Sequence, residues 1–379
     1  MIKYVPSCKR FTGYKPCYPD HNCWLDGCKD NIPIGIKILI INLDAIGDIL
    51  MTTAQLPSLK RKFPESSIYW LTLKISVPLL FNNQYIDQVF SYDAESLNIL
   101  NEMEFDYIMN ADKSQKACAL TNSLSAKNKL GFGLNENGKI IPLNEGAFYN
   151  YNLGMDDRLK FKVNQRTGQD YLAETFELEY KRDEYVFNFS DEEKEFIQNY
   201  KNEAGIKKDD FVIGFNTGCS NLYPNKKMTI RQHIDLINEL LKIGKYKIVL
   251  LGGPEDTERN NEIYSHFKGK IINTPTNLGI RRGACFEDIA DLIITGDSFG
   301  MHLGIALKKH IIVWFGVSCW TEIELYNRGI KLFQENLFCS PCWKKVCPYN
   351  LECIQMIDLN KIIDGVNLYY ERRNINVSK

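Results

Sequence analysis

The pattern of apolar residues changes several times along the first half of the chain, and each change predicts a different element. Residues 36–43 form a nearly continuous apolar run of strand length, which is typical of a parallel strand buried on both faces. Apolar residues at helical spacing follow as far as Pro64, and two further strand-like runs occupy residues 67–73 and 105–110. Strands that alternate with helices in this way predict a parallel α/β sheet.

The same alternation starts again in the second half. Residues 211–215 read as a strand, and the helix predicted over 229–244 begins with a capping box at Thr229. We therefore expect an α/β fold with two facing Rossmann-like domains, each with a parallel sheet. A dehydrogenase can also contain two such halves, so the fold alone does not decide the function. The other strands predicted in this half lie at residues 247–251, 293–295 and 311–315.

Changes in composition along the chain predict the domain boundaries. Residues 150–205 are rich in charged and aromatic residues and are expected to form helices that connect the two domains. The predicted divisions are a cysteine-rich N-terminal segment 1–33, a first Rossmann-like domain 34–190, a second one 205–355 that contains a cysteine cluster, and a C-terminal helix 356–379.

Composition narrows the class of protein. The 379 residues are 44% hydrophobic and 25% charged, which are ordinary values for globular domains. A net charge of −1 argues against a dedicated nucleic-acid binder, which normally has a basic excess. No apolar run approaches the roughly 18 residues of a membrane span, and the N-terminus lacks the apolar core of a secretory signal. These features predict a cytoplasmic protein, with a peripheral position at the inner face of the membrane as the alternative.

The turn after the first strand carries the first candidate site. It contains Asp44, Gly47, Asp48 and Thr52, at the carboxyl edge where α/β proteins bind substrates. The glycine lets the backbone come close to a ligand. Asp48 near a helix start has two interpretations, a ligand-facing carboxylate or a charge that only complements the helix dipole. Spacing alone slightly favours the dipole role.

The second half offers three candidate ligand loops, each at the end of a predicted strand. The first loop combines small and hydroxyl residues with two lysines, which suits a diphosphate. The second contains carboxylates that can accept hydrogen bonds from a ribose. The third opens a helix on which Ser298 and His302, four residues apart, share a face. The residues are Thr217, Gly218, Ser220, Lys226 and Lys227 in the first loop, Glu255 and Asp256 in the second, and Asp297, Ser298 and His302 in the third.

These motifs resemble those of glycosyltransferase family 9, the ADP-heptose:heptosyltransferases. The resemblance spans about residues 36–367 and implies a GT-B fold with an N-terminal acceptor domain and a C-terminal donor domain. It assigns Asp48 as the general base, Thr217 and Lys226 or Lys227 to the phosphates, and the second loop's carboxylates to the position of the family's acidic residue. Asp297, Ser298 and His302 match the run Asp-(Ser/Thr)-Gly-x-x-His. Phe299 replaces the usual Gly of this run, and Met228–Thr229 replaces the Trp-Pro that commonly follows the lysine.

The resemblance implies inverting transfer of a heptose-like sugar from a nucleotide diphosphate, with ADP-heptose as the expected donor. The acceptor would be a glycan, such as lipopolysaccharide, or a protein, and an oligomer is compatible with the sequence. No catalytic metal is expected, and the chain contains no Asp-x-Asp motif. Two alternatives are another GT-B enzyme, such as a nucleotide-sugar epimerase, and a non-catalytic scaffold held together by metal.

Two groups of four cysteines lie near the ends of the chain. Cys339 and Cys342 form a C-x2-C pair, which places two thiolates on one metal ion, and Cys347 and Cys353 complete a four-sulfur set. The N-terminal group is Cys8, Cys17, Cys23 and Cys28. We expect structural Zn or Fe at these sites, because clustered cysteines in a reducing compartment more often hold metal. Disulfides and free thiols are the alternatives. In the family that this chain resembles, a branch that modifies proteins carries iron at a similar C-terminal cluster.

Overall fold

The computed structural model describes residues 7–17, 23 and 28–377. The chain divides into two compact units. Three segments that the composition places in the first domain, 46–51, 153–169 and 184–190, cluster with the second unit, because their contacts lie there and not with their neighbours in sequence. Of the described residues, those within 1–45, 52–152 and 170–183 form the first unit, and those within 46–51, 153–169 and 184–377 form the second.

The first unit contains a six-stranded sheet in the order β3-β2-β1-β4-β5-β6. Strands β1 to β5 are parallel, and β6 is antiparallel to β5. Apolar residues of β1, β2 and β4 pack with Leu100 of α3 and Ala117 of α4. The strands are β1 (Ile36–Ile41), β2 (Ser66–Thr72), β3 (Gln88–Ser91), β4 (Glu104–Asn110), β5 (Ser125–Leu134) and β6 (Ile140–Pro142), and the helices include α2 (Leu56–Lys62), α3 (Ala94–Glu102), α4 (Gln115–Ser123), α5 (Phe148–Met155) and α6 (Gly168–Thr175).

The second unit contains a parallel six-stranded sheet in the order β12-β11-β10-β7-β8-β9. Numbered from the first strand of each unit, both sheets have the order 3-2-1-4-5-6, which is the doubly wound arrangement of dinucleotide-binding folds. The strands are β7 (Phe211–Asn216), β8 (Tyr246–Leu251), β9 (Ile272–Asn273), β10 (Leu292–Gly296), β11 (His310–Trp314) and β12 (Gly329–Leu332).

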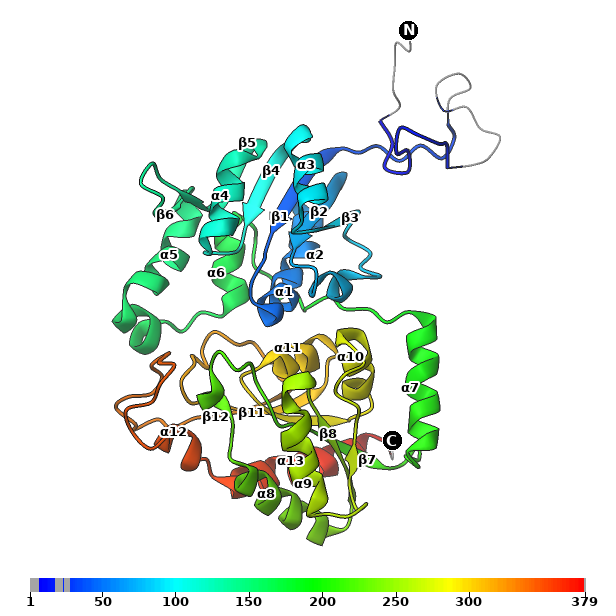
Figure 1. Ribbon diagram of the computed structural model, residues 1–379, viewed down its shortest axis with the longest axis vertical. Helices are drawn as coiled ribbons and strands as arrows, with labels where there is room; N and C mark the ends of the chain where they lie inside the picture. The colour runs from blue at the N-terminus through cyan, green and yellow to red at the C-terminus, as the bar shows by residue number, and fades with distance from the viewer. Residues whose placement is uncertain (1–6, 18–22, 24–27, 378–379) are drawn as a thin grey trace. The chain divides into compact units, whose positions relative to one another are not determined.

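Helices cover both faces of this second sheet (Figure 1). On one face, α8 (Ile230–Ile243), α9 (Thr257–Ser265) and α13 (Leu359–Val377) bury their apolar residues against the strands. On the other lie α10 (Ile280–Asp288) and α11 (Phe299–Ala306), and α7 (Asp191–Glu203) packs on α10. The predicted α/β fold class with two mostly parallel sheets is confirmed.

Helix α8 is the element whose start and end the sequence predicted correctly from its capping residues. Thr229 and Gln232 form the capping box, and Gly244 ends the helix with φ 72° in the left-handed region that favours glycine. Residues 150–205 are only partly helical, because residues 176–190 form no helix between α6 and α7. The C-terminal helix begins at Leu359.

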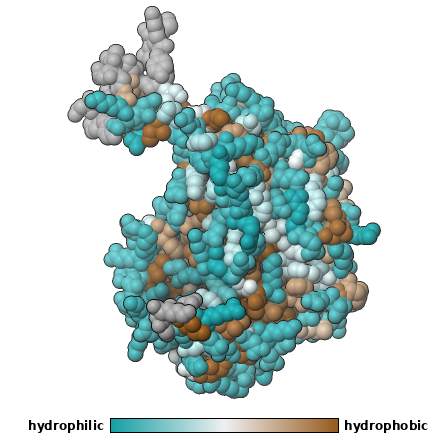
Figure 2. Space-filling view, turned by 180° about the vertical axis from the view of Figure 1, so that it is seen from behind, coloured by the Kyte–Doolittle hydropathy of each residue, from teal (hydrophilic) through white to brown (hydrophobic). Residues whose placement is uncertain are grey.

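The exterior fits the mixed composition. Polar side chains cover much of the face seen in Figure 2, and hydrophobic residues appear between them in patches. Within the described ranges, no helix combines the length and apolarity that crossing a membrane requires.

Candidate functional site

The second sheet reverses its strand order between β7 and β10, and α/β folds bind ligands at the carboxyl ends of the strands at such a point. Strands β10, β7 and β8 are consecutive in this sheet. The three loops predicted to hold a ligand follow these three strands, so their first residues meet at one edge. The sequence did not predict this strand order, and it is the order that brings the loops together.

Asn216, the last residue of β7, joins the first loop to the third. Its side-chain amide donates to Thr295 Oγ1 at 2.9 Å and to Ser298 Oγ at 2.7 Å. A Cβ on Gly300 would lie 2.3 Å from Asn216 Nδ2, so only glycine fits there. The Ser298 hydroxyl is therefore fixed at the start of α11. Asn216 was not among the residues predicted from the sequence, although it directly follows a predicted strand.

A buried ion pair is the second link between the first and third loops. Lys226 Nζ lies 2.7 Å from Asp297 Oδ2, and both side chains are largely buried. Burial acts to raise the pKa of Asp297, but the Lys226 ammonium outweighs burial and the pKa is lowered. The carboxylate therefore stays charged, and the two predicted residues act together as a polar pair.

Lys227 and Asp256 form a looser pair at 3.9 Å. Asp256 accepts a hydrogen bond from the Gly253 N–H at 3.0 Å through Oδ2, while its buried Oδ1 has no hydrogen-bond partner among the described residues. Burial raises the pKa of Asp256, against the effects of the Gly253 N–H and Lys227. A Cβ on Gly218 would overlap Asp256 Oδ1 at 1.7 Å, so the predicted Gly218 is needed for this close approach.

Arg259 and Asn260, two neighbouring residues of α9 that were not predicted from the sequence, hold the first loop by hydrogen bonds. The Thr217 hydroxyl donates to Asn260 Oδ1 at 2.5 Å, and Asn260 Nδ2 donates to the Leu251 carbonyl at 3.1 Å. Arg259 Nε donates to the Thr217 carbonyl at 3.0 Å, and its Nη2 donates to the Met228 carbonyl. The Thr217 hydroxyl therefore already donates its hydrogen to a side chain of the protein. Asn260 lies four residues after Asp256, which directly precedes α9. Residues four apart share one side of a helix, so this spacing was the signal that could have pointed to Asn260.

His302 lies in the same unit as Gly47 and Asp48. Its ring stacks on Tyr185, with Nδ1 3.3 Å from the tyrosine hydroxyl, and a Cβ on Gly47 would lie 2.5 Å from His302 Cδ2. Burial lowers the pKa of His302, and Asp48 acts in the opposite direction. Asp48 is an exposed residue in the first turn of α1 (Ile46–Thr52). The structure therefore associates Asp48 with the third loop.

Asp44 and Thr52, the other residues predicted around the turn after β1, belong to the first unit. Asp44 pairs with Lys116 at 2.6 Å in an exposed position, and the Thr52 hydroxyl accepts a hydrogen bond from Asn42 Nδ2 at 2.8 Å. Buried Asp112, which was not predicted, accepts from the Leu43 and Asp44 N–H groups, both at 3.0 Å. These contacts fix the turn, and none of them involves the second unit.

Ser220 and Glu255 lie at the exposed rim of the loops. The Ser220 hydroxyl accepts from the Leu222 N–H at 3.2 Å, and Glu255 Oε2 accepts from the Asn221 N–H at 3.2 Å. Of the two carboxylates that the resemblance left open, Asp256 is therefore the buried one and Glu255 the exposed one.

The predicted metal sites are less definite. All eight clustered cysteines are described, and all have free thiols. Burial, followed by Cys342, Cys347 and Cys339, raises the pKa of Cys353 to about 11. Within the described residues, no three His, Cys, Asp or Glu side chains are arranged to hold a metal ion. Both four-cysteine sites stay predictions.

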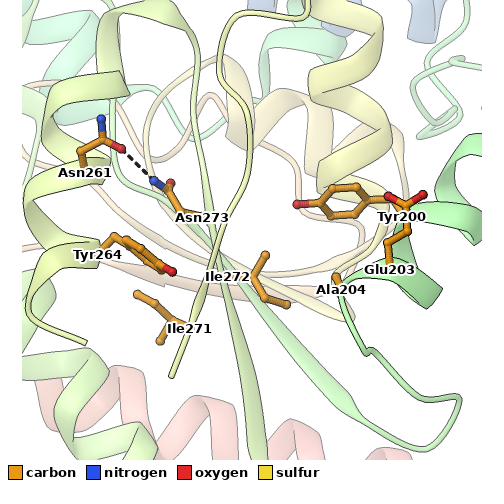
Figure 3. Close-up of a pocket in the computed structure, with 8 residues that line it drawn as sticks. All are labelled: Tyr200, Glu203, Ala204, Asn261, Tyr264, Ile271, Ile272 and Asn273. Atoms are coloured by element: carbon orange, nitrogen blue, oxygen red, sulfur yellow. Dashed lines mark hydrogen bonds between the residues drawn. The ribbon is translucent and has the colours of Figure 1, made fainter. Parts of the chain in front are cut away.

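A cavity of about 520 Å³ in the second unit lies apart from the predicted residues. Figure 3 shows it among side chains of α7, α9 and β9, where Asn273 donates to Asn261 at 2.9 Å. None of its lining residues belongs to the three loops. They are Tyr200, Glu203, Ala204, Asn261, Tyr264, Ile271, Ile272 and Asn273.

Comparisons with known proteins find relatives of this chain. The chain is 25% identical over 301 residues to lipopolysaccharide heptosyltransferase 1 of Campylobacter coli, which covers 75% of this chain and 84% of that protein. Two solved structures share the fold. A family 9 glycosyltransferase of Veillonella parvula has a TM-score of 0.69 and 19% identity, covering 88% of this chain and 96% of that one. The E. coli ADP-heptose lipopolysaccharide heptosyltransferase II has a TM-score of 0.64 and 16% identity, covering 89% and 100%.

The model of the family described as "Glycosyltransferase family 9 (heptosyltransferase)" matches residues 97–352. That range includes all three loops and three cysteines of the C-terminal group, while the turn with Asp48 precedes it. It covers more than half of the 379 residues, so this chain is a glycosyltransferase and belongs to family 9, the heptosyltransferases.

Proposed function

We propose that this glycosyltransferase transfers heptose from ADP-heptose to a glycan acceptor of the lipopolysaccharide type, with inversion at the anomeric carbon. The observation that carries the proposal is the set of three loops at the reversal point of the second sheet, with Lys226 and Lys227 among buried carboxylates. Two of the proteins named above are lipopolysaccharide heptosyltransferases by name, and the name of heptosyltransferase II includes ADP-heptose. A protein acceptor is the alternative within the same family.

In the proposed reaction, Asp48 accepts the proton of an acceptor hydroxyl as that oxygen attacks the anomeric carbon. The bond from this carbon to the diphosphate oxygen breaks, and negative charge collects on the leaving ADP. Lys226, Lys227 and the helix N-terminus at Ser298 would stabilise that charge. Asp256 and Glu255 are the proposed partners of the ribose.

Activity with purified reagents tests the proposal. ADP-heptose is incubated with heptose-deficient lipopolysaccharide, and both ADP release and the mass of the acceptor are followed. We expect ADP release only when the acceptor is present, with one added heptose, and the product's anomeric configuration shows whether inversion occurs. Free sugar or epimer without acceptor would instead support the epimerase alternative. Stabilisation by ADP but not by UDP or GDP in thermal shift would identify the base.

We also propose one Zn or Fe ion at Cys339, Cys342, Cys347 and Cys353, and a second at the N-terminal group. Four thiolates suit either metal, and the four C-terminal cysteines lie within 15 residues of one another in the sequence. The iron-containing glycosyltransferase TibC of E. coli shares the fold, with a TM-score of 0.50 and 11% identity.

Elemental analysis of the purified protein tests the metal proposal. We expect between one and two equivalents of Zn or Fe per chain, and a lower melting temperature for Cys342→Ser. A metal-free, fully folded protein would refute it. A cytoplasmic location also remains part of the proposal, to be tested by cell fractionation.

A further inference from the structure

The cysteine-rich C-terminal segment contacts the lysine proposed to bind the donor phosphates. The ring centroid of Trp343, next to Cys342, lies 4.6 Å from Lys226 Nζ. This distance is within the range of a cation–π interaction. The ammonium is thus held by the Asp297 carboxylate at 2.7 Å and by the indole ring.

Several hydrogen bonds fix Trp343 to the sheet. The N–H groups of Cys342 and Trp343 both donate to the Val317 carbonyl, at 3.0 and 2.8 Å, and Ser340 Oγ donates to the Gly316 carbonyl at 2.7 Å. Gly316 and Val317 closely follow β11, which neighbours β10. The backbone of Trp343 is therefore anchored to the same sheet that carries Asp297.

The lysine loop reaches the cysteine segment by two further contacts. Buried Asn225, which precedes Lys226, donates through Nδ2 to the Lys344 carbonyl at 2.6 Å. The ring of Tyr223 packs edge-on against Trp343, with centroids 5.2 Å apart. Trp343 and the residue after it, Lys344, are thus tied to the segment that presents Lys226.

We propose that Trp343 is a positioning residue, which holds the Lys226 ammonium in place for the donor diphosphate. A free lysine side chain has many rotamers, and ordering it on binding would weaken affinity. The indole face removes that freedom beforehand, because a ring fixed by the backbone restricts where the ammonium can lie. The inference rests on the proposed function, since it assigns a partner to one of its phosphate-binding residues.

Calorimetry with ADP and adenosine tests the inference on the full-length protein. Trp343→Leu should weaken ADP binding by about 3- to 30-fold, the range of a partly buried cation–π contact, and leave adenosine binding unchanged. Trp343→Phe keeps an aromatic face and should restore part of the affinity. In a Lys226→Ala background, Trp343→Leu should cause no further loss of ADP affinity, because the ammonium that it positions is gone.

Tyr349→Leu is the matched control, since it removes an aromatic ring from the same segment. Tyr349 is exposed and packs on Phe338, so ADP affinity should stay at the wild-type value. Equal ADP affinities of wild type and Trp343→Leu would overturn the inference alone. Equal losses for ADP and adenosine, or an undiminished loss in the Lys226→Ala background, would also overturn it. A wild-type protein that binds no nucleoside diphosphate would overturn the proposed function as well.

Discussion

The two units arrange their strands in the same order but carry different chemistry where that order reverses. In the second unit, Lys226 and Asp297 form a buried ion pair and Asn216 ties two loops together. At the equivalent point of the first unit, Asp112 accepts three backbone N–H groups, from Leu43, Asp44 and Ser114. One edge carries lysines paired with buried carboxylates, whereas at the other the carboxylate fixes a turn.

The same strand order therefore carries different side chains at its reversal point, and in such folds the loop residues decide what can bind there. Asp48 makes the contrast sharper. It follows the first strand in sequence, yet it clusters with the second unit and influences His302. A residue from the first half of the chain is thereby placed in the second unit.

The largest expected effect is on Asp48. Asp48→Asn should reduce heptose transfer by about 10²- to 10⁴-fold, because the amide cannot accept the acceptor proton. Binding of ADP, measured by calorimetry, should be unchanged, since the proposed role concerns the acceptor. Asp44→Asn is the control from the same turn and should retain most activity. Near wild-type turnover by Asp48→Asn would remove it as the general base.

The next largest effect is on ADP binding and concerns the two lysines in the first loop of the second unit. Lys226→Ala or Lys227→Ala should weaken ADP binding by about 10- to 100-fold, the value of a charge-assisted hydrogen bond, with adenosine much less affected. Titration of ADP, UDP and GDP into each variant measures this. If both variants bind all three like wild type, the diphosphate lies elsewhere.

A third prediction concerns the support beneath the loops. Asn260→Ala leaves the Thr217 hydroxyl and the Leu251 carbonyl without their partner, and should lower the free energy of unfolding by about 1–3 kcal/mol. Urea denaturation measures the change. The adjacent Asn261→Ala, at an exposed residue, should cost much less. Equal destabilisation by the two variants would contradict a special role for Asn260.

The smallest effect is the acid sensitivity of the second unit, which holds all four described histidines. Burial, and then nearby Arg259, lowers the pKa of His233 to about 3. The unfolded chain therefore binds one more proton between about pH 6.5 and pH 3, and stability falls on acidification by up to about 1.4 kcal/mol per pH unit.

His233→Asn should reduce that slope between pH 6 and pH 5, as measured by urea unfolding at each pH. An unaltered slope in His233→Asn would show that this histidine does not take up the proton on unfolding.

The sequence by itself determined the α/β class, helix α8 with its caps, and the three loops of the second half. These follow from local physics, because apolar runs, capping residues and glycines act within a few positions of one another. Family 9 motifs added the proposed roles of Asp48, Lys226 and Asp297. Short strands such as β9 and β12 carry too few residues for a periodic signal and were missed.

Only the tertiary structure decided which residues meet. Asn260 and Arg259 reach Thr217 from 42 or more positions away, and Trp343 lies over a lysine more than a hundred residues earlier. Such contacts depend on strand order and helix packing, which a single sequence does not encode at fixed spacing. The division of one turn between two units, with Asp44 in the first and Asp48 in the second, has the same origin.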